Sequence, residues 1–165
     1  MDQLIDLATQ LGEAAQQKKQ LIVTAESCTG GLVAQLLTSV AGSSAWFDCG
    51  LITYSNPSKT ALLGVLPATL DTFGAVSEET VSEMALGALA CSRADIAASI
   101  SGIAGPSGGT QEKPVGTVCF AWAHKNGTLI KVTQQFEGDR QEVRKQAAMY
   151  SILGLLEQLS LEQAS

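Results

Sequence analysis

Apolar residues recur along this chain at two spacings, one typical of helices and the other of buried strands. Over residues 3–18 they recur every three or four positions, which predicts a helix. Continuous apolar runs predict strands over residues 21–25, about 50–54, 96–101, 115–123 and 129–136. Asn126-Gly127 lies between the last two runs, and this dipeptide favours the tight turn of a β-hairpin.

The segments between these strands carry signals for helix starts and ends. Pro67 favours a first helical turn, and Ser77 favours an N-cap position. Glycines close to the ends of three segments favour helix termination. The helices predicted in this way cover residues 32–40, 56–64, 67–74, 77–90 and 139–159.

Strands that alternate with helices predict a largely parallel sheet, to which the hairpin adds an antiparallel strand. We therefore expect a single domain over residues 1–165, an α/β fold built as a three-layer α/β/α sandwich. Its mixed, mostly parallel sheet should have about five strands. Ligands of such sheets bind at the carboxyl ends of the strands. The two unusual loops, residues 26–31 and 102–113, both follow strands at that edge.

Composition narrows the functional classes. Hydrophobic residues make up 45% of the chain and charged residues 16%, which is typical of a globular protein. The net charge of −6 argues against a nucleic-acid partner, because a phosphate backbone requires a basic surface. No apolar run approaches the roughly 18–20 residues that span a bilayer. The N-terminus lacks the pattern of a signal peptide, so we expect a cytoplasmic protein with no membrane partner.

The turn Glu26-Ser27-Cys28-Thr29-Gly30-Gly31 is the first candidate site, because it joins a strand to a helix. Ser27 there is a candidate nucleophile. The N–H groups of the residues after it, Thr29, Gly30 and Gly31 among them, would face an oxyanion. Capping of the following helix by Ser27 and Thr29 explains the same residues equally well.

A serine nucleophile needs a base, and the usual base is a histidine. The single histidine, His124, lies beside the hairpin turn, which argues against a Ser-His-Asp enzyme and against Cys28 as a nucleophile. With only this histidine and no metal-like cysteine spacing, we expect no metal. Lysine can replace histidine when its pKa is lowered. Lys59 begins the helix after the second strand, at the same sheet edge as Ser27.

Other residues at this edge have weaker signals. Tyr54 would relay a proton or simply pack at the strand end. The glycine-rich segment that starts at Ser101 and Gly102 and includes Gly105 offers N–H groups to an anion, or it is a plain surface loop. Arg140, with Arg144 one turn later, would hold a phosphate or lie in solvent at a helix start.

Five ordered motifs together resemble one family, the CinA C-terminal domain, which includes stand-alone nicotinamide-nucleotide amidohydrolases. These motifs are Thr24 to Gly31, Tyr54-Ser55-Asn56 with Lys59, Gly74 to Ser77, Ser101 to Gly109, and Lys113 to Val118. The resemblance covers nearly the whole chain. It implies a fold that agrees with the α/β/α prediction. Longer members carry a further N-terminal domain, and nothing in this sequence corresponds to it.

The resemblance also implies an activity, the hydrolysis of nicotinamide mononucleotide to nicotinate mononucleotide and ammonia in the recycling of an NAD breakdown product. It implies a Ser/Lys mechanism without metal or cofactor, in which Ser27 is the nucleophile, Lys59 the base and Tyr54 their neighbour. Ser101 stands where many relatives have threonine, and Arg140 matches a Gly-Asp-Arg motif. A homodimer is expected from the family and from base rates. The alternatives are an inactive nucleotide-sensing module and hydrolysis of another small amide.

Overall fold

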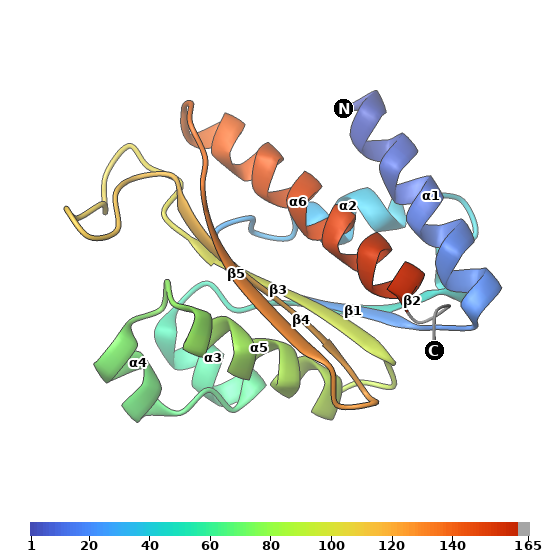
Figure 1. Cartoon of the computed structure of the whole chain (residues 1–165), viewed down its shortest axis with the longest axis horizontal. Coiled ribbons are helices and arrows are strands. Elements are labelled where there is room, and N and C mark those ends of the chain that lie inside the picture. Colours follow the sequence, from blue (N-terminus) through green and yellow to red (C-terminus); the bar gives the residue numbers. More distant parts are fainter. Residues whose placement is uncertain (162–165) are drawn as a thin grey trace.

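The computed structural model describes residues 1–161, in which helices cover both faces of one five-stranded sheet (Figure 1). The helices are α1 (Asp2–Lys18), α2 (Leu32–Thr38), α3 (Asn56–Leu63), α4 (Pro67–Phe73), α5 (Glu78–Ala90) and α6 (Arg140–Leu161), with a short 3-10 helix, η1 (Ser43–Ala45). The strands are β1 (Ile22–Glu26), β2 (Phe47–Ile52), β3 (Ile96–Gly102), β4 (Thr117–His124) and β5 (Leu129–Gln135). No helix of this described part is long and apolar enough to cross a membrane.

The sheet is mixed and has the strand order β2-β1-β3-β4-β5. β1 pairs in parallel with β2 and with β3, whereas β4 pairs antiparallel with β3 and with β5. Four strands therefore run in one direction and only β4 opposes them. The predicted three-layer α/β/α architecture with a mixed sheet is confirmed: α1, α2 and α6 cover one face, and α3, α4 and α5 lie on the other (Figure 1).

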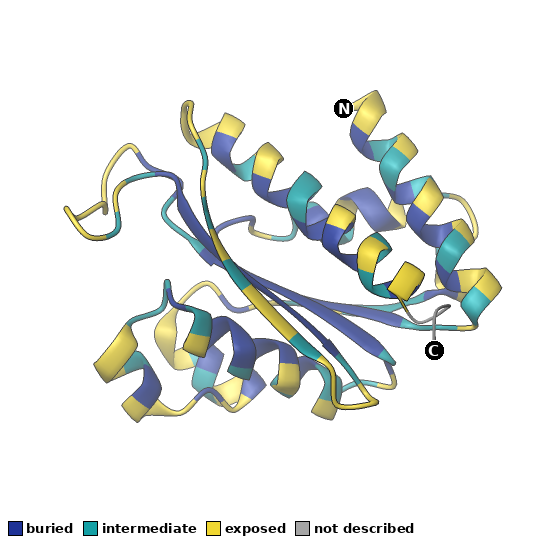
Figure 2. Cartoon of the chain, viewed as in Figure 1, coloured by how far each residue is buried: buried dark blue, intermediate teal, exposed yellow. Residues whose placement is uncertain are grey.

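The central strands are buried on both faces, which explains their largely hydrophobic runs (Figure 2). Successive side chains of a strand point to opposite faces. On β4, Val118, Phe120 and Trp122 belong to the core under α1, α2 and α6. Cys119 and Ala121 belong to the second core, under α5. Each core buries one layer of helices against the sheet.

Of two local predictions, one needs correction and the other is confirmed. The second strand was expected at about 50–54, but β2 covers Phe47–Ile52 and η1 precedes it. β2 lies at the edge of the sheet and is only partly buried, so it lacks the continuous apolar run of a central strand. The predicted cap at Ser77 is confirmed, because its hydroxyl accepts a hydrogen bond from the N–H of Thr80 at 3.1 Å.

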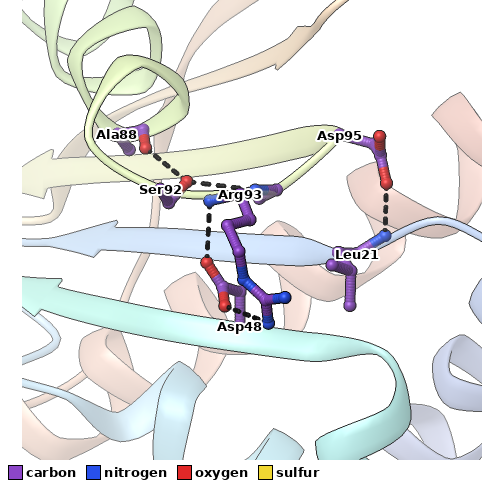
Figure 3. Close-up of polar contacts among 7 residues, drawn as sticks. Leu21, Asp48, Ala88, Ser92, Arg93 and Asp95 are labelled. Atoms are coloured by element: carbon purple, nitrogen blue, oxygen red, sulfur yellow. Dashed lines mark hydrogen bonds and ion pairs between the residues drawn. The ribbon is translucent and has the colours of Figure 1, made fainter.

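The amino ends of the parallel strands are tied together by two aspartates (Figure 3). Asp95, just before β3, accepts a hydrogen bond from the N–H of Leu21 at 2.8 Å. Asp48 on β2 accepts one from the N–H of Arg93 at 2.9 Å and also contacts the Arg93 guanidinium at 3.3 Å. These contacts hold β1, β2 and β3 in register at their amino ends. The carboxyl ends of the strands, on the opposite side of the sheet, are where the candidate site lies.

Candidate active site

The turn after β1 places Ser27 at the carboxyl edge of the sheet. The N–H of Ser27 donates to the carbonyl of Ile100 on β3 at 3.0 Å, which fixes the start of the turn. Gly30 and Gly31 follow with φ of 59° and 100°, a left-handed conformation that glycine adopts without strain. A Cβ on Gly31 would also lie 2.8 Å from Cδ1 of Ile52. The turn therefore requires glycine, and Ser27 remains 8% exposed at the end of it.

Ser27 and Lys59 are in contact. The Nζ atom of Lys59 lies 3.0 Å from Oγ of Ser27. Ser27 directly follows β1, whereas Lys59 lies in the first turn of α3. Nζ also donates to the carbonyl of Thr53 at 2.7 Å and contacts the carbonyl of Tyr54 at 3.4 Å. A neutral amine has two hydrogens and one lone pair. The two carbonyls can take the hydrogens, which leaves the lone pair for the Ser27 hydroxyl.

Burial tunes the chemistry of this pair. The Lys59 side chain is only 1% exposed, and this loss of hydration lowers the pKa of its ammonium from the ordinary value. Negative charge on Cys28 would oppose that shift. Burial, however, raises the pKa of the Cys28 thiol to about 12, so the thiol stays neutral near pH 7. Between residues 1 and 161 no carboxylate pairs with Lys59, so no carboxylate opposes the effect of burial on its pKa.

A cavity of about 290 Å³ opens over Ser27 and Lys59. The residues that line it come from five places: the turn after β1, residues 54–59 at the start of α3, residues 75–76 before α5, the end of β3 with the loop after it, and the start of α6. They are Ser27, Cys28, Tyr54, Asn56, Lys59, Ala75, Val76, Ser101, Gly102, Ile103, Ala104, Gly105, Ser107, Gly108 and Arg140. Seven of the residues singled out from the sequence thus meet in one cavity. Thr29, Gly30, Gly31 and Arg144 do not line it.

Arg140 and Tyr54 close one side of this cavity. The guanidinium of Arg140 donates to the carbonyl of Gly105 at 2.8 Å and to the phenol oxygen of Tyr54 at 3.1 Å. The phenol therefore contacts Arg140, and Tyr54 approaches Lys59 through its backbone carbonyl. The Tyr54 side chain is 62% exposed, so it lies at the mouth of the cavity. In this arrangement it does not bridge Ser27 and Lys59.

The N–H groups of the turn are only partly available to an oxyanion. Gly30 donates to the carbonyl of Ser27 at 3.0 Å, and Gly31 donates to the carboxylate of Glu26 at 3.2 Å. The expectation that these two glycines face a substrate oxyanion does not fit that bonding. Within the described chain, the N–H groups of Cys28, Ala104 and Gly105 line the cavity and have no oxygen acceptor. The N–H groups of four further lining residues, Ala75, Val76, Ser107 and Gly108, also have no oxygen acceptor there, so several backbone donors remain.

His124 lies at the other edge of the sheet. It pairs with Ile96 at the start of β3, and its Nε2 atom lies 2.7 Å from Oε1 of Gln20. Ser27 instead follows Glu26, which pairs with Ile100 near the end of β3. The length of β3 thus separates the histidine from the candidate nucleophile. Over residues 1–161, no group of three or more His, Cys, Asp or Glu side chains gathers in a metal-ligating arrangement.

Glu26 was part of a recognised motif, but the sequence assigned it no role. Its side chain is 1% exposed, and both carboxylate oxygens accept hydrogen bonds at the start of α2. Its position was a signal for this role, since Glu26 directly follows a run of buried strand residues and a charged residue is rarely buried without partners. Asn56, Ala75 and Val76 also line the cavity without a predicted role. All three fall within motifs that carry the family resemblance, but only the fold shows that they lie in the cavity.

Comparison with known proteins agrees with the geometry. The model of the CinA C-terminal domain matches residues 4–159. Nicotinamide-nucleotide amidohydrolase PncC of Enterobacter agglomerans is 55% identical over 149 residues, covering 90% of this chain and 91% of that protein. PncC of Escherichia coli K12 is 53% identical over 156 residues, covering 94% of each. The crystal structure of the competence/damage inducible protein CihA from Agrobacterium tumefaciens has a TM-score of 0.92 and 42% identity, covering 95% of both chains. The chain belongs to the CinA C-terminal domain family.

Proposed function

We propose that this protein is a nicotinamide-nucleotide amidohydrolase that converts nicotinamide mononucleotide and water to nicotinate mononucleotide and ammonia. The observation that carries the proposal is the contact of 3.0 Å between Ser27 Oγ and the buried Lys59 Nζ at the floor of a cavity. The relatives named nicotinamide-nucleotide amidohydrolase support the choice of substrate, since they match nearly the full chain.

The first half of the reaction forms an ester. Neutral Lys59 accepts the proton of the Ser27 hydroxyl while Oγ attacks the carboxamide carbon. The carbonyl π electrons move onto oxygen, and backbone N–H groups of cavity-lining residues, those of Cys28, Ala104 and Gly105 among them, stabilise that oxyanion. The Lys59 ammonium then donates its proton to the leaving nitrogen. The C–N bond breaks, ammonia departs, and a nicotinoyl ester of Ser27 remains.

The second half of the reaction hydrolyses the ester. Lys59 is neutral again and accepts a proton from a water molecule that attacks the ester carbon. When the second tetrahedral intermediate collapses, Ser27 Oγ leaves and takes the proton from Lys59. The product is the carboxylic acid, which ionises to the carboxylate and gives its proton to the released ammonia. No other base is required, because the same amine serves in both halves.

The nucleotide phosphate has a cationic partner in the cavity wall. Besides Lys59, Arg140 is the positively charged side chain that lines the cavity. A guanidinium can bind phosphate oxygens through two N–H groups at once. Ser107 and Gly108 line the same cavity and bring the glycine-rich loop close. We place the phosphate at Arg140 and this loop, with the carboxamide at Ser27.

The test is ammonia release from nicotinamide mononucleotide. The wild-type protein should release ammonia, the Ser27→Ala variant should not, and Ser160→Ala, which removes an exposed hydroxyl of α6, should match the wild type. If the folded wild type binds the nucleotide but releases no ammonia, the protein is a nucleotide-sensing module. If it hydrolyses other small amides instead, the proposed substrate is wrong.

A further inference from the structure

The turn that carries Ser27 lies between two charged side chains that do not line the cavity. On one side is the carboxylate of Glu26, and on the other is the guanidinium of Arg144. Both bind backbone atoms of the turn. They therefore control the orientation of the peptide groups around the nucleophile.

Glu26 holds the end of the turn. One carboxylate oxygen accepts hydrogen bonds from the Thr29 hydroxyl at 2.6 Å and from the N–H groups of Gly31 at 3.2 Å and Val33 at 3.0 Å. The other oxygen accepts from the N–H of Ala34 at 3.0 Å. Glu26, the last residue of β1, thus caps α2 with its side chain. Its contacts connect the residue before the turn to Gly31 at the end of the turn.

Arg144 holds the carbonyls of the same turn. Its Nε atom donates to the carbonyl of Cys28 at 3.2 Å, and Nη2 donates to the carbonyl of Thr29 at 3.0 Å. The third nitrogen, Nη1, donates to the side chain of Gln141 at 2.9 Å. Because the C=O and N–H of a trans peptide point in opposite directions, the held Thr29 carbonyl also orients the N–H of Gly30. This N–H donates to the carbonyl of Ser27 at 3.0 Å, and the held Ser27 carbonyl in turn orients the N–H of Cys28.

We propose that Glu26 and Arg144 are positioning residues that set the Ser27 hydroxyl and the Cys28 N–H for the reaction, and that Arg144 does not bind the substrate phosphate. The proposal rests on the proposed function. All three nitrogens of Arg144 are engaged within the chain. Arg140, one turn earlier on α6, is the arginine that faces the cavity.

The arrangement needs both residues, because each controls a different part of the turn. Glu26 binds the N–H groups of α2 and leaves the Cys28 carbonyl unrestrained. Arg144 binds the Cys28 and Thr29 carbonyls and reaches them from a helix 115 residues further along the chain. If the contacts of Glu26 or those of Arg144 are lost, a peptide group of the turn can rotate. A displacement of about 1 Å at a reacting atom can cost about 10²-fold in rate.

The experiment compares two substrates that share the carboxamide, nicotinamide mononucleotide and nicotinamide riboside, which lacks the phosphate. For Arg144→Lys we expect kcat to fall about 10²-fold on both substrates with KM nearly unchanged, so that the ratio of their kcat/KM values stays at the wild-type value. Arg140→Lys is the matched control, and it should reduce that ratio. A reduced ratio in Arg144→Lys as well would show that Arg144 binds the phosphate and would overturn the proposal.

A fluorophosphonate that labels reactive serines gives a readout that does not depend on the substrate. Labelling should occur at Ser27 in the wild type and slow at least about tenfold in Glu26→Gln and Arg144→Lys, at a temperature where thermal unfolding shows each variant folded. Glu26→Asp, which keeps the charge but withdraws the carboxylate, gives the same test if Glu26→Gln does not fold. Labelling at the wild-type rate would refute the positioning role. A wild type that is labelled but releases no ammonia would refute the proposed substrate instead.

Discussion

Replacement of Lys59 by methionine tests two properties of this residue separately: its role as the base, and the effect of its burial on the free energy of unfolding. Methionine has nearly the length of lysine and no charge, so it can occupy the buried channel beneath Ser27. Amide hydrolysis should be lost, since a general base contributes about 10²–10⁴-fold. The carbonyls of Thr53 and Tyr54 lose their donor, which lowers the free energy of unfolding by an amount that does not depend on pH.

The pH dependence follows from the lowered pKa of Lys59. Between that pKa and the ordinary value of about 10.4, the folded protein holds a neutral amine while the unfolded chain holds an ammonium. The unfolded state then binds one more proton, and the free energy of unfolding rises with pH by up to about 1.4 kcal/mol per unit. As the pH rises from the folded pKa toward about 10.4, the wild type should therefore gain stability over Lys59→Met, by up to about 1.4 kcal/mol per pH unit. Below the folded pKa the difference is constant.

Urea unfolding of both proteins at several pH values between 7 and 10 measures this difference directly, because groups that titrate in both proteins cancel. Lys131→Met, which removes an exposed ammonium of β5, is the control for the loss of one surface charge. A difference between wild type and Lys59→Met that is flat, or that falls as the pH rises, would mean that folding does not lower the pKa of Lys59. Lys59 would then keep its proton near pH 7 and could not serve as the base.

Three further substitutions test the packing and the nucleophile. In Gly87→Ala the new Cβ would lie 1.8 Å from the carbonyl oxygen of Leu63, at the end of the helix that carries Lys59, so both thermal stability and kcat should fall. In Gly154→Ala the Cβ would lie 2.1 Å from the ring of Trp122, and calorimetry should show a loss of about 1–3 kcal/mol with activity kept at lower temperature. Cys28→Ala should keep most of the wild-type kcat, because a thiol with a pKa of about 12 is not the nucleophile; an inactive but folded variant would contradict this.

Local patterns were sufficient for most of the fold. Helix caps, glycine stops and the Asn126-Gly127 turn act within a few residues, so their effects are visible in the sequence. β2 was misplaced because it begins at Phe47 and contains Gly50, a residue that weakens a strand signal. Gly50 is required there by a neighbour that the sequence does not reveal: a Cβ would lie 2.9 Å from the hydroxyl of Thr24 on β1.

The sequence was sufficient to predict part of the set of residues that line the cavity. Ser27, Lys59 and Arg140 were recognisable because each begins or ends an element at the carboxyl edge of the sheet, and the sheet topology then brings them together. The functions of Glu26 and Arg144 depend on which backbone groups they reach. The Arg144 contact with Cys28 joins residues 116 positions apart, and no local pattern encodes it. Sequence can name such residues, but only tertiary structure distinguishes a ligand of the substrate from a support of the turn.

The charges around Ser27 explain why a lysine without a carboxylate partner suits this reaction. Glu26 lies one residue before the nucleophile, yet its charge is turned toward the positive end of α2 and is balanced there. The same contact occupies that helix end, so the oxyanion must be stabilised by other donors. When Lys59 takes the proton of Ser27, the ammonium and the oxyanion form together in the buried cavity. Burial disfavours the ammonium in the free enzyme, but the new oxyanion is the counter-charge that it lacked. A permanent carboxylate beside Lys59 would stabilise the ammonium before the reaction and so remove the base.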